Sequence, residues 1–287
     1  MAKRKPPAPG RWTCPACHRA VSTPYCPHCG ERPLRARDLT LRGLFDQAVQ
    51  ALSSVDGRVL RSFKSLIARP GALTLAYLDG PRKPYILPLQ LFLIANVFFF
   101  AMESLTGVKV FSTTLDFHLH DQEIWRDLAQ RLVAHRLAAK GTTLELYTPI
   151  FNRAVALNAK SLIGLMVLPF AALPALLFAR QRRPFVAHAV FALHLYAFVL
   201  LLFCAALVVS AIDEAVGGAG LASKVLDRVL SVTQLVACAV YLYVAIGAVY
   251  GARGAARTVK AVVLALAVAG IGLGYRFALF LITLYGT

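Results

Sequence analysis

The sequence predicts an all-α membrane protein with five transmembrane helices and a small metal-binding head at its N-terminus. Two observations lead to this prediction. Hydrophobic residues make up 58% of the 287 residues and charged residues only 16%, whereas charged residues are about 25% of ordinary soluble domains. In addition, four of the six cysteines fall early in the chain, as two Cys-x-x-Cys pairs. The chain is therefore too apolar for a soluble protein of its length, and a separate small domain precedes the apolar part.

Five continuous apolar stretches are each long enough to cross a bilayer. About 20 helical residues cover the roughly 30 Å of hydrocarbon, and only helices or closed barrels satisfy every backbone polar group in lipid. The stretches do not alternate between polar and apolar residues, so we expect helices and exclude a barrel. The predicted spans are Ile86–Leu105, Ser161–Ala179, Phe185–Ile212, Val229–Tyr250 and Ala261–Tyr285.

The distribution of basic residues predicts the orientation of these spans. Residues 1–85 contain fifteen Lys and Arg but only five Asp and Glu, and positive loops stay on the cytoplasmic side of a membrane. The loops between the second and third spans and between the fourth and fifth spans are also basic, with Arg180, Arg182, Arg183, Arg253, Arg257 and Lys260. We therefore expect a multi-pass protein of the cell inner membrane, with a cytoplasmic N-terminus and an external C-terminus. No secretory signal is recognisable, so we expect no cleavage.

The cysteine pairs predict a structural zinc site. Thiols persist in the reducing cytoplasm, and four thiolates at this spacing suit a tetrahedral zinc ion. The expected ligands are Cys14, Cys17, Cys26 and Cys29. An iron centre and a metal-free head are less favoured alternatives, and His18 or His28 could replace a cysteine. Four protein ligands leave no open position on the ion, which argues against zinc catalysis. The other two cysteines, Cys204 and Cys238, lie in predicted spans and are expected to be core residues.

Three segments follow from these patterns: the head (residues 1–38), interfacial helices with an elbow (39–85) and a transmembrane domain (86–287). Two helical patterns in the middle segment are amphipathic. The first contains Leu41, Leu44, Phe45, Ala48, Val49 and Leu52, and the second contains Val55, Val59, Leu60, Phe63, Leu66 and Ile67 beside Arg58, Arg61 and Lys64. These helices either lie in the cytoplasmic headgroup layer against anionic lipid or pack on the ends of the spans.

The predicted outer loop, residues 106–158, is expected to be folded. Apolar spacing predicts a helix from about Asp121 to Lys140, preceded by a short strand, Leu115–His120. On a strand, the side chains of residues 116, 118 and 120 would share one face. Asp116, His118 and His120, joined by His135, could then form a second metal site, although a solvated polar face is the favoured interpretation.

Polar residues within spans are costly in lipid and often functional. The candidates are Asn96, Glu103, His188, His194, Gln234 and Arg276. Glu103 and Arg276 could neutralise each other, or Arg276 could extend to the membrane surface. A proton or solute path could involve His188, His194 and Asn96, but buried histidines more often bond to one neighbour.

The region before the first span resembles a known type of protein. The motifs are the cysteine pairs, the amphipathic helices, Arg69-Pro70-Gly71, Tyr77-Leu78-Asp79-Gly80, Arg82, Tyr85, Pro88 and Asn96-Val97-Phe98-Phe99-Phe100. Over about the first 105 residues, they resemble a bacterial family of uncharacterised zinc-ribbon membrane proteins. That resemblance implies the same layout and no known activity. Arg82, Lys83 and Tyr85 would mark the membrane interface, and the Pro-Gly to Pro segment is either a rigid elbow, which we favour, or a hinge.

The function expected from the sequence is non-enzymatic. The head would be a docking or regulatory module that couples a cytoplasmic protein partner to the membrane. The main alternative is a small-solute or ion transporter or channel gated by the head, and a lipid-modifying enzyme is a third, less favoured one. A Gly-rich phosphate loop, a nucleophile elbow and a paired carboxylate site are not recognisable. A head close to the bilayer is poorly placed to bind nucleic acid, and the pattern is compatible with a homo-oligomer.

Overall fold

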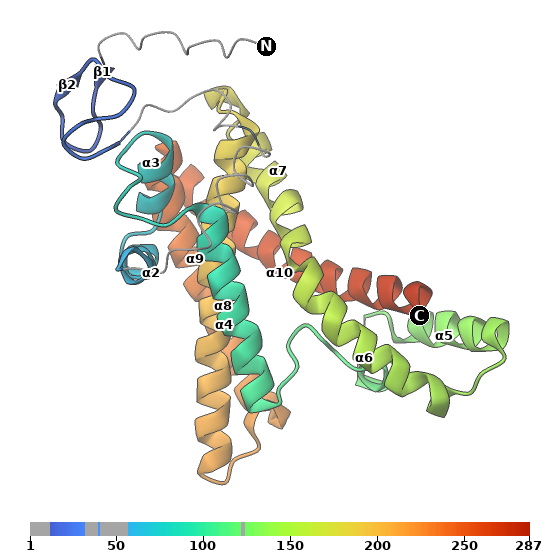
Figure 1. Ribbon diagram of the computed structural model, residues 1–287. Helices are drawn as coiled ribbons and strands as arrows, with labels where there is room; N and C mark the ends of the chain where they lie inside the picture. Colours follow the sequence, from blue (N-terminus) through green and yellow to red (C-terminus); the bar gives the residue numbers. More distant parts are fainter. Residues whose placement is uncertain (1–11, 32–39, 41–56, 122–123) are drawn as a thin grey trace, which may run out of the picture. The chain divides into compact units, whose positions relative to one another are not determined.

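The computed structural model describes residues 12–31, 40, 57–121 and 124–287 (Figure 1). Within this part of the chain, five helical segments are long and apolar enough to cross a membrane, which confirms the predicted fold class. The segments are Pro88–Thr106, Leu144–Leu177, Phe185–Ala215, Lys224–Tyr250 and Gly254–Gly286. The chain therefore has the composition and helix lengths of a multi-pass membrane protein.

Short elements precede the first long helix. They are the strands β1 (Trp12–Thr13) and β2 (Ala20–Val21) and the helices α2 (Arg58–Ala68) and α3 (Ala72–Leu78). The strands pair antiparallel, with Trp12 opposite Val21 and Thr13 opposite Ala20. The amphipathic helix predicted over Leu41–Leu52 lies outside the described residues, whereas the second predicted helix corresponds to α2.

The remaining elements form the transmembrane part and its connections. They are α4 (Pro88–Thr106), η2 (Phe117–Asp121), α5 (Arg126–Lys140), α6 (Leu144–Leu162), η3 (Ile163–Met166), α7 (Val167–Leu177), η4 (Ala179–Gln181), α8 (Phe185–Ala215), η5 (Gly220–Ala222), α9 (Lys224–Tyr250) and α10 (Gly254–Gly286). Pro88 is the first residue of α4, a position where proline's missing N–H costs no hydrogen bond.

The second long helical segment begins earlier than the sequence predicted. Residues 144–158, assigned to the outer loop, form most of α6, which continues through η3 into α7. A 3₁₀ turn at Ile163–Met166 joins α6 to α7, and it lies next to Pro169, which has no N–H to donate to the carbonyl of residue 165. The apolar stretch from Ser161 was therefore only the second half of a longer helix.

The strand predicted over Leu115–His120 is also wrong. Residues Phe117–Asp121 form a short π-helical turn, η2, and the following helix begins at Arg126. Leu115 and Leu119 are both buried, with 0% and 6% of their surface exposed. Their four-residue spacing is typical of a helical turn, and six residues are too few for the sequence pattern to separate a strand from a helix.

The chain divides into two compact units. The first contains Met1–Ala95, Ala171–Leu200 and Ala237–Val262. In this unit, the Tyr250 ring stacks parallel to Phe178, with centroids 4.2 Å apart, and parallel to His188 at 5.5 Å. The Lys260 ammonium lies 4.2 Å from the centroid of the Phe178 ring and donates to the Leu177 carbonyl. These contacts fix the ends of α7, α8, α9 and α10 to one another.

The second unit contains Asn96–Phe170, Leu201–Val236 and Val263–Thr287. A cluster of buried side chains from η2, α5, α6 and the C-terminal end of α10 forms one part of its core. Figure 1 shows that end of α10 beside α5 and α6, where Tyr147 Oη donates to the Leu284 carbonyl at 3.1 Å and Arg136 donates to the Tyr285 carbonyl. The segment predicted as an outer loop is therefore packed on the last long helix.

Candidate metal centre

The first cysteine knuckle is a tight turn closed by two backbone hydrogen bonds. The N–H of His18 donates to the Cys14 carbonyl at 2.8 Å, and the N–H of Cys14 donates to the Arg19 carbonyl at 2.9 Å. His18 has a φ of 55°, in the left-handed region, which lets the chain reverse directly after Cys17. The turn therefore presents Cys14 and Cys17 on one side, as two ligands to a single ion require.

The second knuckle repeats the same turn. Gly30 donates to the Cys26 carbonyl at 2.6 Å, and Cys26 donates to the Glu31 carbonyl at 2.7 Å. Gly30 has a φ of 65°, where glycine has no steric penalty. Glu31 thus occupies the position that Arg19 has in the first knuckle, and its backbone closes the turn that carries Cys26 and Cys29.

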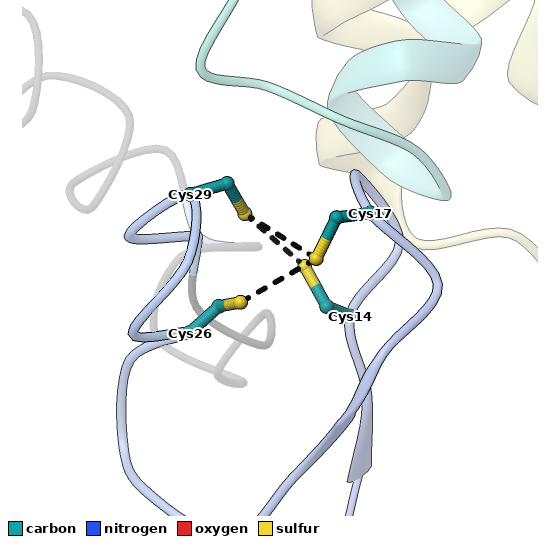
Figure 2. A group of neighbouring side chains, drawn as sticks. All are labelled: Cys14, Cys17, Cys26 and Cys29. Atoms are coloured by element: carbon teal, nitrogen blue, oxygen red, sulfur yellow. Dashed lines mark hydrogen bonds between the residues drawn. The ribbon is translucent and has the colours of Figure 1, made fainter.

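The four cysteine sulfurs converge on one point (Figure 2). The Sγ atoms of Cys14 and Cys29 are 3.4 Å apart, those of Cys17 and Cys26 are 3.5 Å apart, and those of Cys17 and Cys29 are 3.9 Å apart. In a tetrahedron with metal–sulfur bonds of about 2.3 Å, the sulfurs would be about 3.8 Å apart. All six cysteines are free thiols. The four thiols can therefore hold a metal ion without rearrangement of the turns.

The thiols of this group differ in acidity. The backbone amide of Cys29, together with that of His28, lowers the pKa of Cys26 to about 6. The backbone amide of Glu31 acts in the same direction on Cys29, but burial and the neighbouring thiols outweigh it and raise the pKa of Cys29 to about 12. Cys26 is therefore more acidic than Cys29, and binding of a metal ion by all four sulfurs must release protons.

Glu31 joins the second knuckle to the loop that leads into α4. We call residues 79–87, between α3 and α4, the elbow loop. Glu31 is only 3% exposed, and its Oε2 accepts from the backbone N–H groups of Arg82 at 3.2 Å and Lys83 at 3.3 Å. The Arg82 guanidinium lies 3.7 Å from Oε1. The Lys83 ammonium packs closely against Gly30, because a Cβ added to this glycine would overlap it. The head is thus bonded to the elbow loop at its second knuckle.

The elbow loop is bonded in turn to α2. The Arg61 guanidinium donates to the Pro84 carbonyl at 3.4 Å, and the N–H of Ile86 donates to Ser62 Oγ at 3.0 Å. Ser62 is fully buried. Two of the residues predicted to mark the membrane interface, Arg82 and Lys83, therefore bind the head, and the loop between them and α4 is fixed by α2.

α3 connects this region to the long helices of the same unit. Thr74 Oγ1 and His194 Nδ1, from α3 and α8, form a buried hydrogen bond of 2.9 Å. Gly71, with a φ of 88°, lies against α9, because a Cβ there would be 3.1 Å from the Ala245 carbonyl oxygen. A small cavity between α3, the elbow loop and α8 brings together three predicted site residues, Arg82, Tyr85 and His194.

The region from α2 to α4 is also the part of the chain that resembles other proteins. Residues 56–100 match a family model described as "Protein of unknown function (DUF3667)". The match covers α2, α3, the elbow loop and most of α4, and it does not include the four cysteines. It supports the resemblance seen in the sequence for the elbow and the beginning of the first span. No curated protein and no solved structure matches the chain.

The other polar residues predicted within spans have separate surroundings. His188 Nδ1 bonds to Tyr250 Oη at 2.8 Å. Glu103 Oε1 accepts from the N–H of Val110 at 2.7 Å, whereas Arg276 Nε donates to the carbonyl of Val110 at 2.9 Å. Glu103 and Arg276 therefore bind opposite sides of one residue, and the described residues show no direct ion pair between them.

The last two polar residues predicted within spans are Asn96 and Gln234. The Oδ1 atom of Asn96 is buried without a hydrogen-bond partner among the described residues. Gln234 is half-buried on α9. These two residues therefore define no site of their own.

The second metal site considered from the sequence does not form. His118 is fully buried and bonds to Thr113 Oγ1 at 2.9 Å, and its Nδ1 accepts from Trp125 Nε1 at 3.2 Å. Burial, and secondarily the charge of Arg276, lowers the pKa of His118 to about 4. Asp116 and His120 instead form an exposed pair at 2.9 Å. Within the described residues, the four cysteines are the group of three or more potential ligands that could hold a metal.

Glu31 is the site residue that sequence reasoning missed. It is the sole acidic residue in the first 37 positions, and it directly follows the second knuckle among several arginines. An isolated acidic residue at the position that closes a metal-binding turn was the sequence feature that could have identified Glu31 as a site residue. The pattern alone did not indicate its partners, because the elbow loop lies about 50 residues further along the chain.

Proposed function

We propose that this chain is a non-enzymatic membrane protein in which a zinc-binding head serves as a docking or regulatory module for a cytoplasmic protein. The observation that supports this function best is the contact between Glu31 and the elbow loop. It joins the metal-binding turn to the chain just before the first long helix. A ligand that displaces the head must therefore break bonds to the membrane domain.

The metal is proposed to be zinc. Four thiolates at nearly tetrahedral separations favour Zn²⁺ over hard cations, which prefer oxygen ligands. Within residues 12–31, the head has a very small core of its own, made of Cys14, Val21 and Cys26 with Trp12 beside them. A core of this size cannot hold a domain folded, so the ion would supply most of its stability. Zinc is thus structural, and the surface that it organises is functional.

The proposed location is the inner membrane with the head in the cytoplasm. The basic loops support this orientation, as does the requirement of a thiolate site for a reducing compartment. An impermeant maleimide added to intact cells should then leave the head cysteines unlabelled, even after zinc is chelated with a permeant chelator. Labelling of Cys14 or Cys26 from outside the cell would show that the head lies on the external side of the membrane.

The rival function, a transporter gated by the head, needs a polar path through the spans. His188 and His194 each bond to a different neighbour, Tyr250 and Thr74, and not to each other. Separate, satisfied histidines are what structural packing requires, whereas a proton path requires linked groups. The geometry therefore favours docking over transport.

The test compares proteins captured from a mild detergent extract by three full-length chains. The first is unchanged, the second carries Cys14→Ala with Cys26→Ala, and the third carries Cys204→Ala with Cys238→Ala as a matched control for cysteine loss. We expect the second chain to lose bound zinc and the captured partner while it still inserts into the membrane. The control should retain both. Identical sets of captured proteins from all three chains would refute the docking function.

A further inference from the structure

α2 has one face that packs against the protein. Its buried residues are Ser62, Ser65 and Leu66. Ser62 Oγ accepts from the N–H of Ile86, which lies two residues before the start of α4. If α4 spans the membrane, its first residues lie near the lipid headgroups. α2 must therefore lie at about the same depth, because it is bonded to the chain at that point.

The opposite face of α2 exposes large apolar side chains. Leu60 is 76% exposed and Ile67 is 56% exposed. Lys64, also exposed, lies between them on the same face, since residues four and three apart are neighbours on a helix. Arg61 is exposed at the edge of this face, and its guanidinium donates to the Pro84 carbonyl of the elbow loop. The face itself carries a basic side chain between two apolar ones, and we call it the α2 outer face (Leu60, Lys64 and Ile67).

The charged residues within α2 and the turn that follows it are all basic. Residues 57–78 contain four basic residues and no acidic residue. The basic residues are Arg58, Arg61, Lys64 and Arg69. A helix with an apolar stripe and interspersed cations fits the headgroup layer of an anionic bilayer, where the apolar side chains reach the acyl boundary and the cations meet phosphates.

We propose that the α2 outer face binds anionic phospholipid in the leaflet on the head's side of the membrane. A protein partner or a second copy of this chain fits less well, because the cores of protein interfaces are depleted in lysine and bury about 800 Å² on each side. Lys64 lies at the centre of this face, and two apolar side chains cannot supply such an area. The proposal does not rest on the docking function of the head.

The experiment uses the full-length chain in vesicles and introduces a tryptophan on the α2 outer face. Leu60→Trp and Ile67→Trp are made separately, and Tyr25→Trp is the control, because Tyr25 is 57% exposed on the head. The vesicles contain phosphatidylcholine with either brominated phosphatidylglycerol or brominated phosphatidylcholine, since bromine quenches tryptophan on contact. The added fluorescence is measured as the difference from the unmodified chain.

We expect both tryptophans on α2 to be quenched and the control to be unaffected. Brominated phosphatidylglycerol should quench at a lower mole fraction than brominated phosphatidylcholine. Adding Lys64→Gln should reduce that preference by up to about fivefold, the effect of removing one cation from an anionic surface. Quenching that is equal for the two lipids would overturn the anionic assignment. A blue-shifted but unquenched tryptophan would show that protein covers the face, and a signal like that of the control would show that water does; either result overturns the proposal.

Discussion

Replacement of Glu31 by alanine should detach the head from the elbow loop and leave the long helices intact. The Glu31 carboxylate accepts two backbone hydrogen bonds, at 3.2 and 3.3 Å, and lies 3.7 Å from the Arg82 guanidinium. Hydrogen bonds to a charged group contribute about 1.5–3 kcal/mol each. Removing one partner of a buried pair costs about 3–5 kcal/mol. Because the Glu31 and Arg82 side chains are 4% and 13% exposed, solvent screening reduces this cost little. We therefore expect a loss of about 3 kcal/mol or more.

Amide hydrogen exchange measures this loss directly. Two of the bonds protect the N–H groups of Arg82 and Lys83, so a loss of about 3 kcal/mol should speed their exchange by at least about 100-fold. Glu31→Gln keeps the shape and loses the charge, so its effect should be smaller, about tenfold. Mass spectrometry of the full-length protein in detergent, with fragmentation to single residues, resolves these two amides.

The matched control is Glu145→Ala, which removes an exposed glutamate from the first turn of α6. It should leave the exchange rates of both elbow amides unchanged. If exchange at Arg82 and Lys83 in Glu31→Ala equals that of the unmodified chain, Glu31 is not their acceptor in solution. The Glu31 carboxylate would then not join the metal-binding turn to the elbow loop.

Three further predictions concern the metal, a glycine and a histidine. Chelation of the metal should speed exchange of the same two elbow amides as much as Glu31→Ala does, because the turn that positions the carboxylate loses its ligands; protection that survives chelation would show that the head folds without metal. Gly71→Ala should lower the thermal midpoint more than Gly107→Ala. Both glycines have positive φ, which costs alanine about 1–2 kcal/mol, but only at Gly71 would the added Cβ also lie 3.1 Å from a carbonyl oxygen. Equal midpoints would contradict the packing of Gly71 on α9. His118 has a pKa of about 4 in the folded protein and 6.5 in the unfolded chain. Between these pH values the unfolded state binds more protons than the folded state. Up to about 3 kcal/mol of stability is therefore lost as the pH falls from 6.5 to 4. Denaturation followed by Trp125 fluorescence should show this pH dependence, His118→Gln should remove it, and exposed His120→Gln should not.

The long helices could be predicted because their signal is local and strong. Each apolar stretch must satisfy its own backbone in lipid, so length and hydropathy determine it without reference to the rest of the fold. The start of the second span was predicted wrongly because polar residues interrupt its apolar sequence. α6 carries Glu145, Asn152 and Lys160 among its apolar residues. A window that requires uninterrupted hydrophobicity therefore began the second span at Ser161, although the helix starts at Leu144.

The cysteine ligands could also be predicted, because two residues of separation suffice to bring both sulfurs of a knuckle to one ion. The partners of polar residues could not. Thr74 and His194 are 120 residues apart, and Glu31 and Arg82 are 51 residues apart. Periodicity places a side chain on a face of its own helix, but the pairing of two faces depends on tertiary packing. Glu103 and Arg276 illustrate the limit, since both bind Val110, whereas the sequence suggested either that their charges neutralise each other or that Arg276 extends to the membrane surface.

The contacts of the elbow loop distinguish a head that docks from a head that gates. The loop is fixed by two kinds of bonds. Glu31 of the head binds the amides of Arg82 and Lys83, whereas Arg61 and Ser62 of α2 bind Pro84 and Ile86. Displacing the head breaks only the first kind.

The second kind lies closer to α4, so it still holds the chain where the first span begins. A partner that captures the head would therefore free residues 82 and 83 and leave α4 in place. For gating, the same event would also have to break the bonds from α2 or the buried bond between Thr74 and His194. This arrangement supports the proposed docking function, in which the head can detach from a fixed membrane domain. Exchange at the Ile86 amide tests this distinction. It should stay slow in Glu31→Ala while the amides of Arg82 and Lys83 exchange fast, and joint acceleration of all three would favour gating.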